Sequence, residues 1–473
     1  AMVDSANFDA RAVIDGVDLT HYELEANDLL ELDKLFVYAS TFGSLIQMPD
    51  FLGGKISFLK RLSEYKSEDI FVSASIKNIT PLIKQSQLLA MKYDVVIANP
   101  PYMGGRGMPH SLKGFALKNF PDTKTDLFAM FVERGFSWCK PTGFNCMVTM
   151  QSWMFLSTYE SMRKTLLSEF TIRSMVHLGA RAFSEISGEI VQTTAFVLSR
   201  NNVARFRPVF FRLLENQGEQ KRKDLLEGKN RFDNRIQDDF KKIPGMPIAY
   251  WVGNKVIEAL SELPSLSSLA TAKQGLATGD NNRFLRYWHE VSFKDISFDV
   301  KTFSDSVNEI IKWVPYSKGG GERKWFGFNE FIVDWKNGGN EIRNFKDNNG
   351  NERSRFRGFD YYFHEAATWG LISSGIFTCR YRDAGFVYDV GGMSLFTNEG
   401  DLNFFIGFLN SNVAMSILKI ISPTLNFPSG DIARLPMAIK SSSRVTDIVA
   451  ECINLARSDW DAYEASWDFQ KES

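Results

Sequence analysis

The stretch that decides the fold is Tyr93-Asp-Val-Val-Ile-Ala-Asn-Pro-Pro-Tyr102. Residues 93–98 are a short apolar run of the kind found in buried parallel strands. The tetrapeptide Asn99-Pro100-Pro101-Tyr102 follows this run directly. Because open α/β sheets place their ligand sites at the carboxyl ends of strands, the tetrapeptide is predicted to lie at a functional edge of a sheet.

Helical and strand patterns alternate on both sides of this stretch. Before it, apolar residues at spacings of three and four predict helices within 29–62, with a break at Met48-Pro49, and over 76–91. After it, the expected elements are helices at 126–139 and 159–169 and strands at 143–149, 172–178 and 192–199. This alternation predicts an α/β fold with a mostly parallel sheet.

A chain of 473 residues is long enough for more than one domain. We expect a helical lead-in over 1–92, the core of the first domain over 93–200, and a polar connecting region over 201–248. A second domain is expected over 249–440, followed by a C-terminal helix over 441–473. Short aromatic runs and glycine clusters in the second domain indicate mixed α and β structure with long loops.

Several classes of protein are disfavoured by the composition. The sequence has no apolar run of about 18 residues and no basic leader, so we expect a cytoplasmic protein that does not contact a membrane. The four cysteines form no CxxC pair and the five histidines form no HxxxH pattern, so neither disulfides nor a metal site are expected.

The net charge of −1 hides a strong segregation of charge along the chain. Residues 1–35 hold nine acidic and two basic side chains, and residues 447–473 hold seven and two, which leaves +11 for residues 36–446. A central body of that charge can attract a phosphate backbone, although a solvated surface with acidic ends explains the pattern equally well.

The tetrapeptide offers a set of groups suited to an aromatic amine such as that of adenine. The lone pair of such an amine is delocalised into the ring, so it must be localised before the nitrogen can take a methyl group. The side-chain oxygen of Asn99 and the carbonyl of Pro100, held rigid by Pro101, can accept its two N–H bonds. Tyr102 offers an aromatic face on which a flipped base can stack. The same four residues also occur as a plain turn.

The motifs around the tetrapeptide resemble those of a known family. Residues 94–102 match the amino-methyltransferase signature [DNS]PP[YFW], and Asp126-Leu-Phe-Ala-Met-Phe-Val132, residues 143–149 and Ser152-Trp-Met-Phe155 resemble later motifs of the γ-class adenine methyltransferases. Residues 178–183 followed by 191–196 resemble the motif that gives the flipped base a second aromatic wall. The resemblance implies that Phe183 stacks opposite Tyr102, although Phe183 could equally be a core residue.

Two segments of the second domain, 274–280 with Phe284 and 422–433, are similar to target-recognition regions of single-chain restriction-modification enzymes. With Phe42-Gly-Ser-Leu-Ile46 and residues 459–469, nearly the whole chain resembles the central part of the PglX-type adenine methyltransferases of bacteriophage exclusion (BREX) systems. The resemblance implies a partial Rossmann-like class I methyltransferase sheet followed by a mixed α+β target-recognition domain. It also implies S-adenosyl-L-methionine as cofactor, and double-stranded DNA and other phage-defence proteins as partners.

One family feature is missing from the sequence. The family opens its methyltransferase domain with a strand and a Gly-rich loop that cradles the methionine part of the cofactor, and no such loop is found here. We expect the chain to begin after that loop, so its cofactor-binding residues are unknown.

Six residues in or beside Gly-rich loops of the second domain are candidates for contacts with phosphates or base edges. They are Lys273, Thr278, Arg283, Lys318, Arg323 and Lys324. Taken singly, each of them is better explained as a solvated surface residue, and the prediction of DNA contact is made for the group.

Three functions fit the sequence. The first is an N6-adenine DNA methyltransferase of a phage-defence system. The second is a catalytically silent DNA-recognition fragment of such an enzyme. The third is a protein glutamine methyltransferase, because an amide nitrogen poses the same lone-pair problem, although such enzymes need little beyond the core fold.

Overall fold

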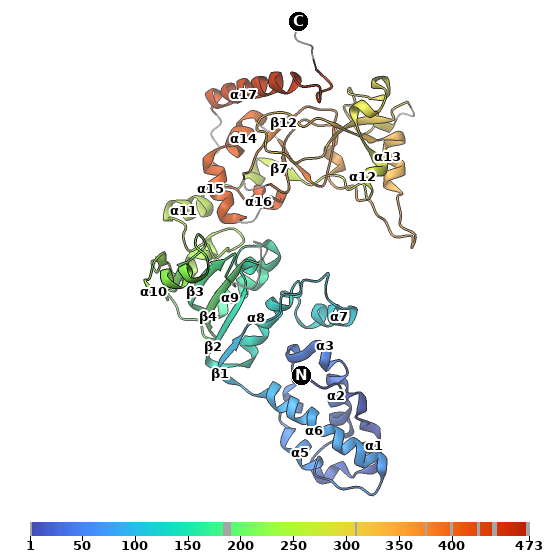
Figure 1. Ribbon diagram of the computed structural model, residues 1–473, viewed down its shortest axis with the longest axis vertical. Coiled ribbons are helices and arrows are strands. Elements are labelled where there is room, and N and C mark those ends of the chain that lie inside the picture. Colours follow the sequence, from blue (N-terminus) through green and yellow to red (C-terminus); the bar gives the residue numbers. More distant parts are fainter. Residues whose placement is uncertain are drawn as a thin grey trace. The chain divides into compact units, whose positions relative to one another are not determined.

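The computed structural model describes residues 2–182, 191–307, 310–373, 376–397, 401–422, 426–437 and 442–469. The chain divides into two compact units, Ala1–Lys241 and Lys242–Ser473, which we call the first and the second unit (Figure 1). The boundary between the units falls inside the polar stretch 201–248. The domain limits expected within each unit stay predictions.

The first unit opens with a group of helices around an apolar core. They are α1 (Ala10–Gly16), α2 (Ala26–Phe36), α3 (Ala39–Phe42), α4 (Asp50–Gly53), α5 (Ile56–Leu62) and α6 (Ile70–Ala90). The expected break at Met48-Pro49 is confirmed, because α3 ends before it and α4 begins after it. Leu29, Leu32 and Phe36 line the buried side of α2, as their spacing predicts.

The strands of the first unit form one mixed sheet. They are β1 (Tyr93–Ala98), β2 (Cys139–Met150), β3 (Thr171–Gly179), β4 (Thr193–Ser199), β5 (Val209–Arg212) and β6 (Arg231–Phe232). Their order is β1-β2-β4-β3-β5-β6. β1 is parallel to β2, with Ile97 opposite Cys146, and β4 is antiparallel to both β2 and β3.

The expectation of a mostly parallel sheet is wrong. Among the described residues, two of the five strand pairs in this sheet are parallel. Parallel neighbours need a crossover, usually a helix, and the described part of the chain has no helix between β3 and β4. The stretch expected to be a plain connection also contributes β5, β6 and the helix α10 (Gly218–Leu226).

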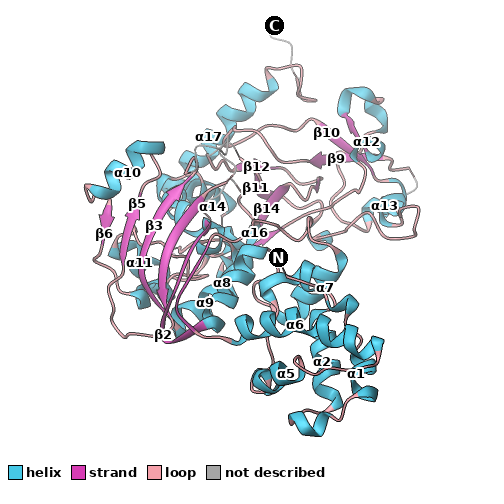
Figure 2. Ribbon diagram, turned by 60° about the horizontal axis from the view of Figure 1, so that its bottom comes forward, coloured by secondary structure: helices cyan, strands magenta, loops and turns pink. Residues whose placement is uncertain are grey.

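The two faces of the sheet differ in how well they are covered. Helices α8 (Leu127–Trp138) and α9 (Glu160–Glu169) pack on one face, and Phe128, Met130 and Phe136 of α8 are buried (Figure 2). On the other face, apolar side chains that include Val148 and Val176 line a shallow hollow of about 220 Å³. The helix α7 (His110–Asn119) lies in the chain between β1 and α8.

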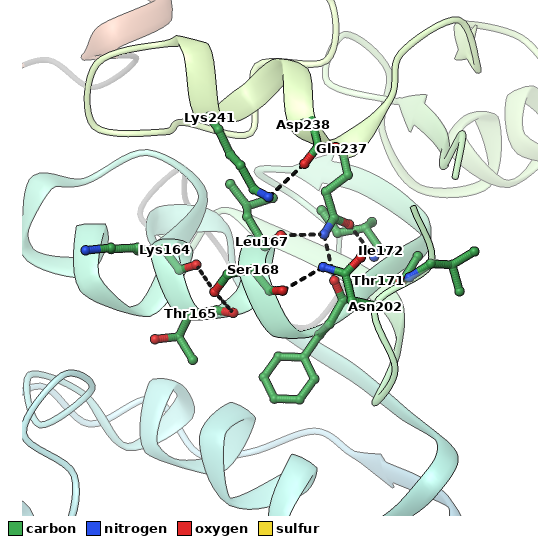
Figure 3. Close-up of polar contacts among 12 residues, drawn as sticks. Lys164, Thr165, Leu167, Ser168, Thr171, Ile172, Asn202, Gln237, Asp238 and Lys241 are labelled. Carbon is green, nitrogen blue, oxygen red and sulfur yellow. Dashed lines mark hydrogen bonds and ion pairs between the residues drawn. The ribbon is translucent and has the colours of Figure 1, made fainter. Parts of the chain in front are cut away.

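Gln237 fastens the connection between α9 and β3 (Figure 3). Its side-chain nitrogen donates to the carbonyls of Leu167 at 3.0 Å and Phe170 at 2.6 Å. Its side-chain oxygen accepts the backbone N–H of Ile172 at 2.8 Å. Because Gln237 is buried, these bonds satisfy an amide that would otherwise cost free energy to desolvate.

The second unit contains two four-stranded sheets, ordered β12-β11-β14-β7 and β13-β9-β10-β8. The strands are β7 (Ala270–Lys273), β8 (Leu285–Tyr287), β9 (Trp313–Ser317), β10 (Phe331–Asp334), β11 (Ala366–Gly370), β12 (Arg380–Arg382), β13 (Val387–Tyr388) and β14 (Gly392–Thr397). The helices are α11 (Asn254–Glu262), α12 (Asn281–Phe284), α13 (Lys336–Arg343), α14 (Leu402–Leu409), α15 (Asn412–Ile421), α16 (Ser429–Ala433) and α17 (Ser443–Asp461). The expected mixture of α and β elements with long loops is confirmed.

The described residues contain neither a single membrane-spanning helix nor a cluster of metal ligands. None of their helices is by itself long and apolar enough to cross a bilayer. Helices α14 and α15 together have the length and composition of such a span, but they are bent by 66° relative to each other. No group of three or more His, Cys, Asp or Glu side chains in the described ranges is arranged to hold a metal ion.

Candidate active site

The predicted tetrapeptide lies where the sequence placed it, directly after β1. Asn99 is exposed, and its side chain makes no hydrogen bond to any residue that the structure describes. Pro100 is buried beneath it, and Pro101 is exposed. The amide of Asn99 is therefore free to accept a hydrogen bond from a ligand, at the end of a strand that fixes the backbone.

Tyr102 is held by the first turn of α8. Its ring meets the ring of Phe128 edge-on, with the centroids 6.1 Å apart and the planes at 87°. Phe128 is fully buried, so it provides a rigid support. Burial raises the pKa of Tyr102, and the nearby carboxylate of Asp126 raises it further. The tyrosine therefore stays a neutral aromatic surface at physiological pH.

Asp126 joins the tetrapeptide to α8. Its Oδ1 accepts the backbone N–H of Met103 at 3.0 Å and that of Phe128 at 3.2 Å. Burial raises the pKa of Asp126, while the backbone N–H groups that it accepts oppose that shift. Residues 126–132 resemble a family motif, but the sequence alone gives no role to Asp126 or Phe128, because no local pattern pairs residue 103 with residue 126.

Phe183 lies outside the described residues, so its stacking role stays a prediction. Just before it in the chain, the carbonyls of Leu178 and Ala180 accept hydrogen bonds from the buried Nζ of Lys221. Nearby on β3, burial lowers the pKa of His177 to about 3, and the charges of Arg212 and Lys221 contribute.

Most of the predicted DNA contacts in the second unit have partners within the chain. Arg283 is paired with Glu341, Arg323 with Asp459, and the Nζ of Lys324 donates to the carbonyl of Asn410. The Nζ of Lys318 lies 4.3 Å from the centroid of the Phe331 ring. Thr278 is buried, and its hydroxyl donates to the side-chain oxygen of Asn281. Lys273 is exposed on β7. Their role in DNA binding stays a prediction.

A groove runs along the free edge of β1. It has a volume of about 760 Å³ and is lined mainly by apolar side chains, among them Leu88, Val95, Ile97 and Trp138. The expectation that residues 93–98 form a buried strand is wrong for this chain, because none of them is buried and Val95 and Ile97 are 47% and 80% exposed. Apolar side chains of this kind normally fill the cores of sheets.

The mixed sheet with the tetrapeptide at the end of β1 resembles the core of class I methyltransferases that act on amino groups. The family described as Eco57I restriction-modification methylase matches residues 32–183. The fold is also shared with the type IIL restriction-modification enzyme MmeI, solved in complex with DNA, at a TM-score of 0.50 and 11% identity over 95% of this chain and 64% of that one.

Two curated relatives are much closer in sequence. The adenine-specific methyltransferase BrxX of Escherichia coli O9:H4 (strain HS) is 43% identical over 460 residues, which are 96% of this chain and 36% of that protein. The adenine-specific methyltransferase PglX of Lacticaseibacillus casei (strain Zhang) is 39% identical over 397 residues, which are 82% and 33%. The chain is a homologue of the BrxX and PglX adenine-specific methyltransferases and spans about a third of their length.

Such methyltransferases use S-adenosyl-L-methionine, and the described residues around the β1 groove do not by themselves form a site for it. The groove beside β1 is mostly apolar, and the side chain of Gln85 in it is already bonded to the backbone of Val3. No Gly-rich turn after a strand faces the groove in the described part of the chain.

Proposed function

We propose that this chain is the amino-group site and the DNA-recognition part of a longer N6-adenine DNA methyltransferase. The observation that carries the proposal is the exposed amide of Asn99 at the end of β1, which makes no hydrogen bond to a described residue and is followed by a buried proline and a supported tyrosine ring. The homology to adenine-specific methyltransferases over 96% of the chain supports the choice of adenine.

In this proposal the tetrapeptide acts on an adenine that has left the DNA stack. The side-chain oxygen of Asn99 and the carbonyl of Pro100 accept the two N–H bonds of the amine, which localises its lone pair. Tyr102 stacks on the purine, and such stacking contributes about 1 to 3 kcal/mol. In the full-length protein S-adenosyl-L-methionine would supply the methyl group, and the excess proton of the methylated amine would be lost to water.

The cofactor site is completed, in this proposal, by a part of the full-length protein outside these 473 residues. Two surfaces of the first unit support this idea. Among the described residues β1 has a strand partner on one side only, and its Ile97 is 80% exposed. The apolar face that contains Val148 and Val176 has no helix upon it in the described part of this unit. Additional strands and helices of the same protein would bury both surfaces.

The second unit is proposed to select the DNA sequence. Lys273 and Lys318 are its candidate contacts, because their ammonium groups lie over aromatic rings and form no ion pair with a described residue. Methylation of host DNA would then mark it for a phage-defence system, in association with other proteins of that system.

The test is methyl transfer from labelled S-adenosyl-L-methionine by the full-length protein. Unmethylated duplex DNA and a mixture of cellular proteins serve as substrates, and the product is identified by mass spectrometry. We expect N6-methyladenine in the DNA and no methylglutamine in the proteins. Methylglutamine without methyladenine would contradict the proposal, and DNA binding without any transfer would favour a recognition fragment that is catalytically silent.

A further inference from the structure

The backbone directly after the tetrapeptide is held at two points by the start of α8. The N–H of Met103 donates to the Oδ1 of Asp126 at 3.0 Å, and the carbonyl of Met103 accepts the N–H of Leu127 at 3.2 Å. One residue on, Gly104 and Asp126 form an isolated antiparallel bridge. Both backbone groups of the residue next to Tyr102 are thus bound to residues 126 and 127.

The same carboxylate oxygen also fixes the support of Tyr102. Oδ1 of Asp126 accepts the N–H of Phe128 at 3.2 Å, and the buried ring of Phe128 meets the ring of Tyr102 edge-on. A single oxygen atom therefore sets the position of the chain that leaves the tetrapeptide and of the ring behind its tyrosine.

A helix cap alone does not account for this arrangement. Asp69 caps α6 in a related way, because its Oδ1 accepts the N–H groups of Phe71 at 2.8 Å and Val72 at 3.1 Å. The bonds of Asp69 stay within its own helix. Asp126 differs because one of its two N–H donors, Met103, lies 23 residues away, beside Tyr102.

We propose that Asp126 is a positioning residue for the methyl-transfer reaction, which holds the tetrapeptide in register with α8 through its bond to the Met103 N–H. The inference rests on the proposed function. Asp126 contacts no substrate. Its loss would let the Asn99 and Pro100 acceptors drift relative to the ring of Tyr102, while the surfaces that bind DNA stay unchanged.

The experiment compares four variants of the full-length enzyme, with kcat and the KM for DNA measured separately. Asp126→Ala is expected to lower kcat by about 10- to 100-fold, because a shift of about 1 Å at reacting groups has effects of that size. Asp126→Asn retains an acceptor oxygen and should recover most of kcat. Asp69→Ala removes a helix cap elsewhere and should leave kcat unchanged. In all of these variants the KM for DNA should stay within about threefold of the wild type, because the expected change is limited to the positioned acceptors.

The fourth variant, Asp126→Ser, keeps a favourable helix cap on a side chain that is one bond shorter. If Asp126→Ala does not fold, Asp126→Ser still tests the positioning role of Asp126. We expect its kcat to be lower than that of the wild type. A kcat of Asp126→Ser or Asp126→Ala equal to that of Asp69→Ala would overturn the inference, as would an Asp126→Asn variant no better than Asp126→Ala. If the wild type transfers no methyl group to adenine, the proposed function itself fails, and the two failures are thereby distinguished.

Discussion

The ring of Tyr102 stands edge-on to the ring of Phe128, with the two planes at 87° and the centroids 6.1 Å apart. The tyrosine comes from the loop after β1 and the phenylalanine from the first turn of α8. This contact links the two elements that carry the candidate site, and Phe128 in turn lies 5.8 Å from the ring of Tyr159. The face of Tyr102 is thereby held in place by a small aromatic cluster.

Shortening Phe128 should weaken both the fold and the stacking face. Phe128→Ala removes a fully buried ring, so we expect a loss of about 3 to 5 kcal/mol in the free energy of unfolding. Phe128→Leu should cost less and fold, while it lowers methyl transfer because Tyr102 loses its edge contact. Urea unfolding and transfer rates measure the two effects. A Phe128→Leu enzyme with wild-type rate would show that the support of the ring is dispensable.

Gln237 is expected to matter for stability and not for catalysis. Gln237→Ala leaves the buried N–H of Ile172 and the carbonyls of Leu167 and Phe170 without their partner. Each unsatisfied group costs about 1 to 3 kcal/mol, and water entering the space would reduce that cost. Thermal unfolding of wild type and variant gives the difference. A melting temperature equal to the wild type would contradict the role assigned to this side chain.

The burial of His177 is expected to make the free energy of unfolding depend on pH. Its pKa is lowered from 6.5 to about 3 by burial, so the folded chain holds it neutral where the unfolded chain would protonate it. The unfolded state therefore binds more protons between pH 3 and 6.5, and the free energy of unfolding falls as the pH drops through that window. The slope from this group is at most about 1.4 kcal/mol per pH unit. Unfolding curves between pH 5 and 7.5 should show it, and His177→Gln should flatten it. An equal slope in the variant would assign the pH dependence to other groups.

Substitution of Ile97 is expected to affect the isolated chain and the full-length protein differently. Ile97→Lys should change the stability of the 473-residue chain by no more than about 0.5 kcal/mol, because the side chain is 80% exposed. In the full-length protein, where we propose that this edge is covered, the same change should lower both the melting temperature and the affinity for S-adenosyl-L-methionine. Ile70→Lys, also 80% exposed but on α6, is the matched control and should be neutral in both. If Ile97→Lys is harmless in the full-length protein, this edge is not covered there.

The parts of the structure that the sequence predicted are those carried by local patterns. The apolar run before Asn99 is β1, and the expected helix and strand segments from residue 126 to residue 199 are present within a few residues of their predicted bounds. A strand followed by a rigid Pro-Pro pair can be predicted from the sequence, because the strand pattern and the proline geometry both depend on only a few neighbouring residues.

The remaining features depend on contacts between distant residues. Asp126 acts on Met103 across 23 residues, and Arg323 pairs with Asp459 across 136. The direction of β4 depends on where it pairs, which its own alternating pattern does not encode, so the sheet was expected to be more parallel than it is. The partners of the basic residues in the second unit could not be predicted either, because they lie far away in the sequence.

The central claim is that the Asn99 amide accepts a hydrogen bond from the adenine amine, and one comparison tests it most directly. Methyl transfer and DNA affinity are measured for the full-length wild type and for Asn99→Ala, with unmethylated duplex DNA and labelled S-adenosyl-L-methionine. Because Asn99 is exposed and bonds to no described residue, we predict that transfer is abolished while the DNA dissociation constant stays within about twofold, as expected for a surface change. Transfer at the wild-type rate by Asn99→Ala would contradict the account.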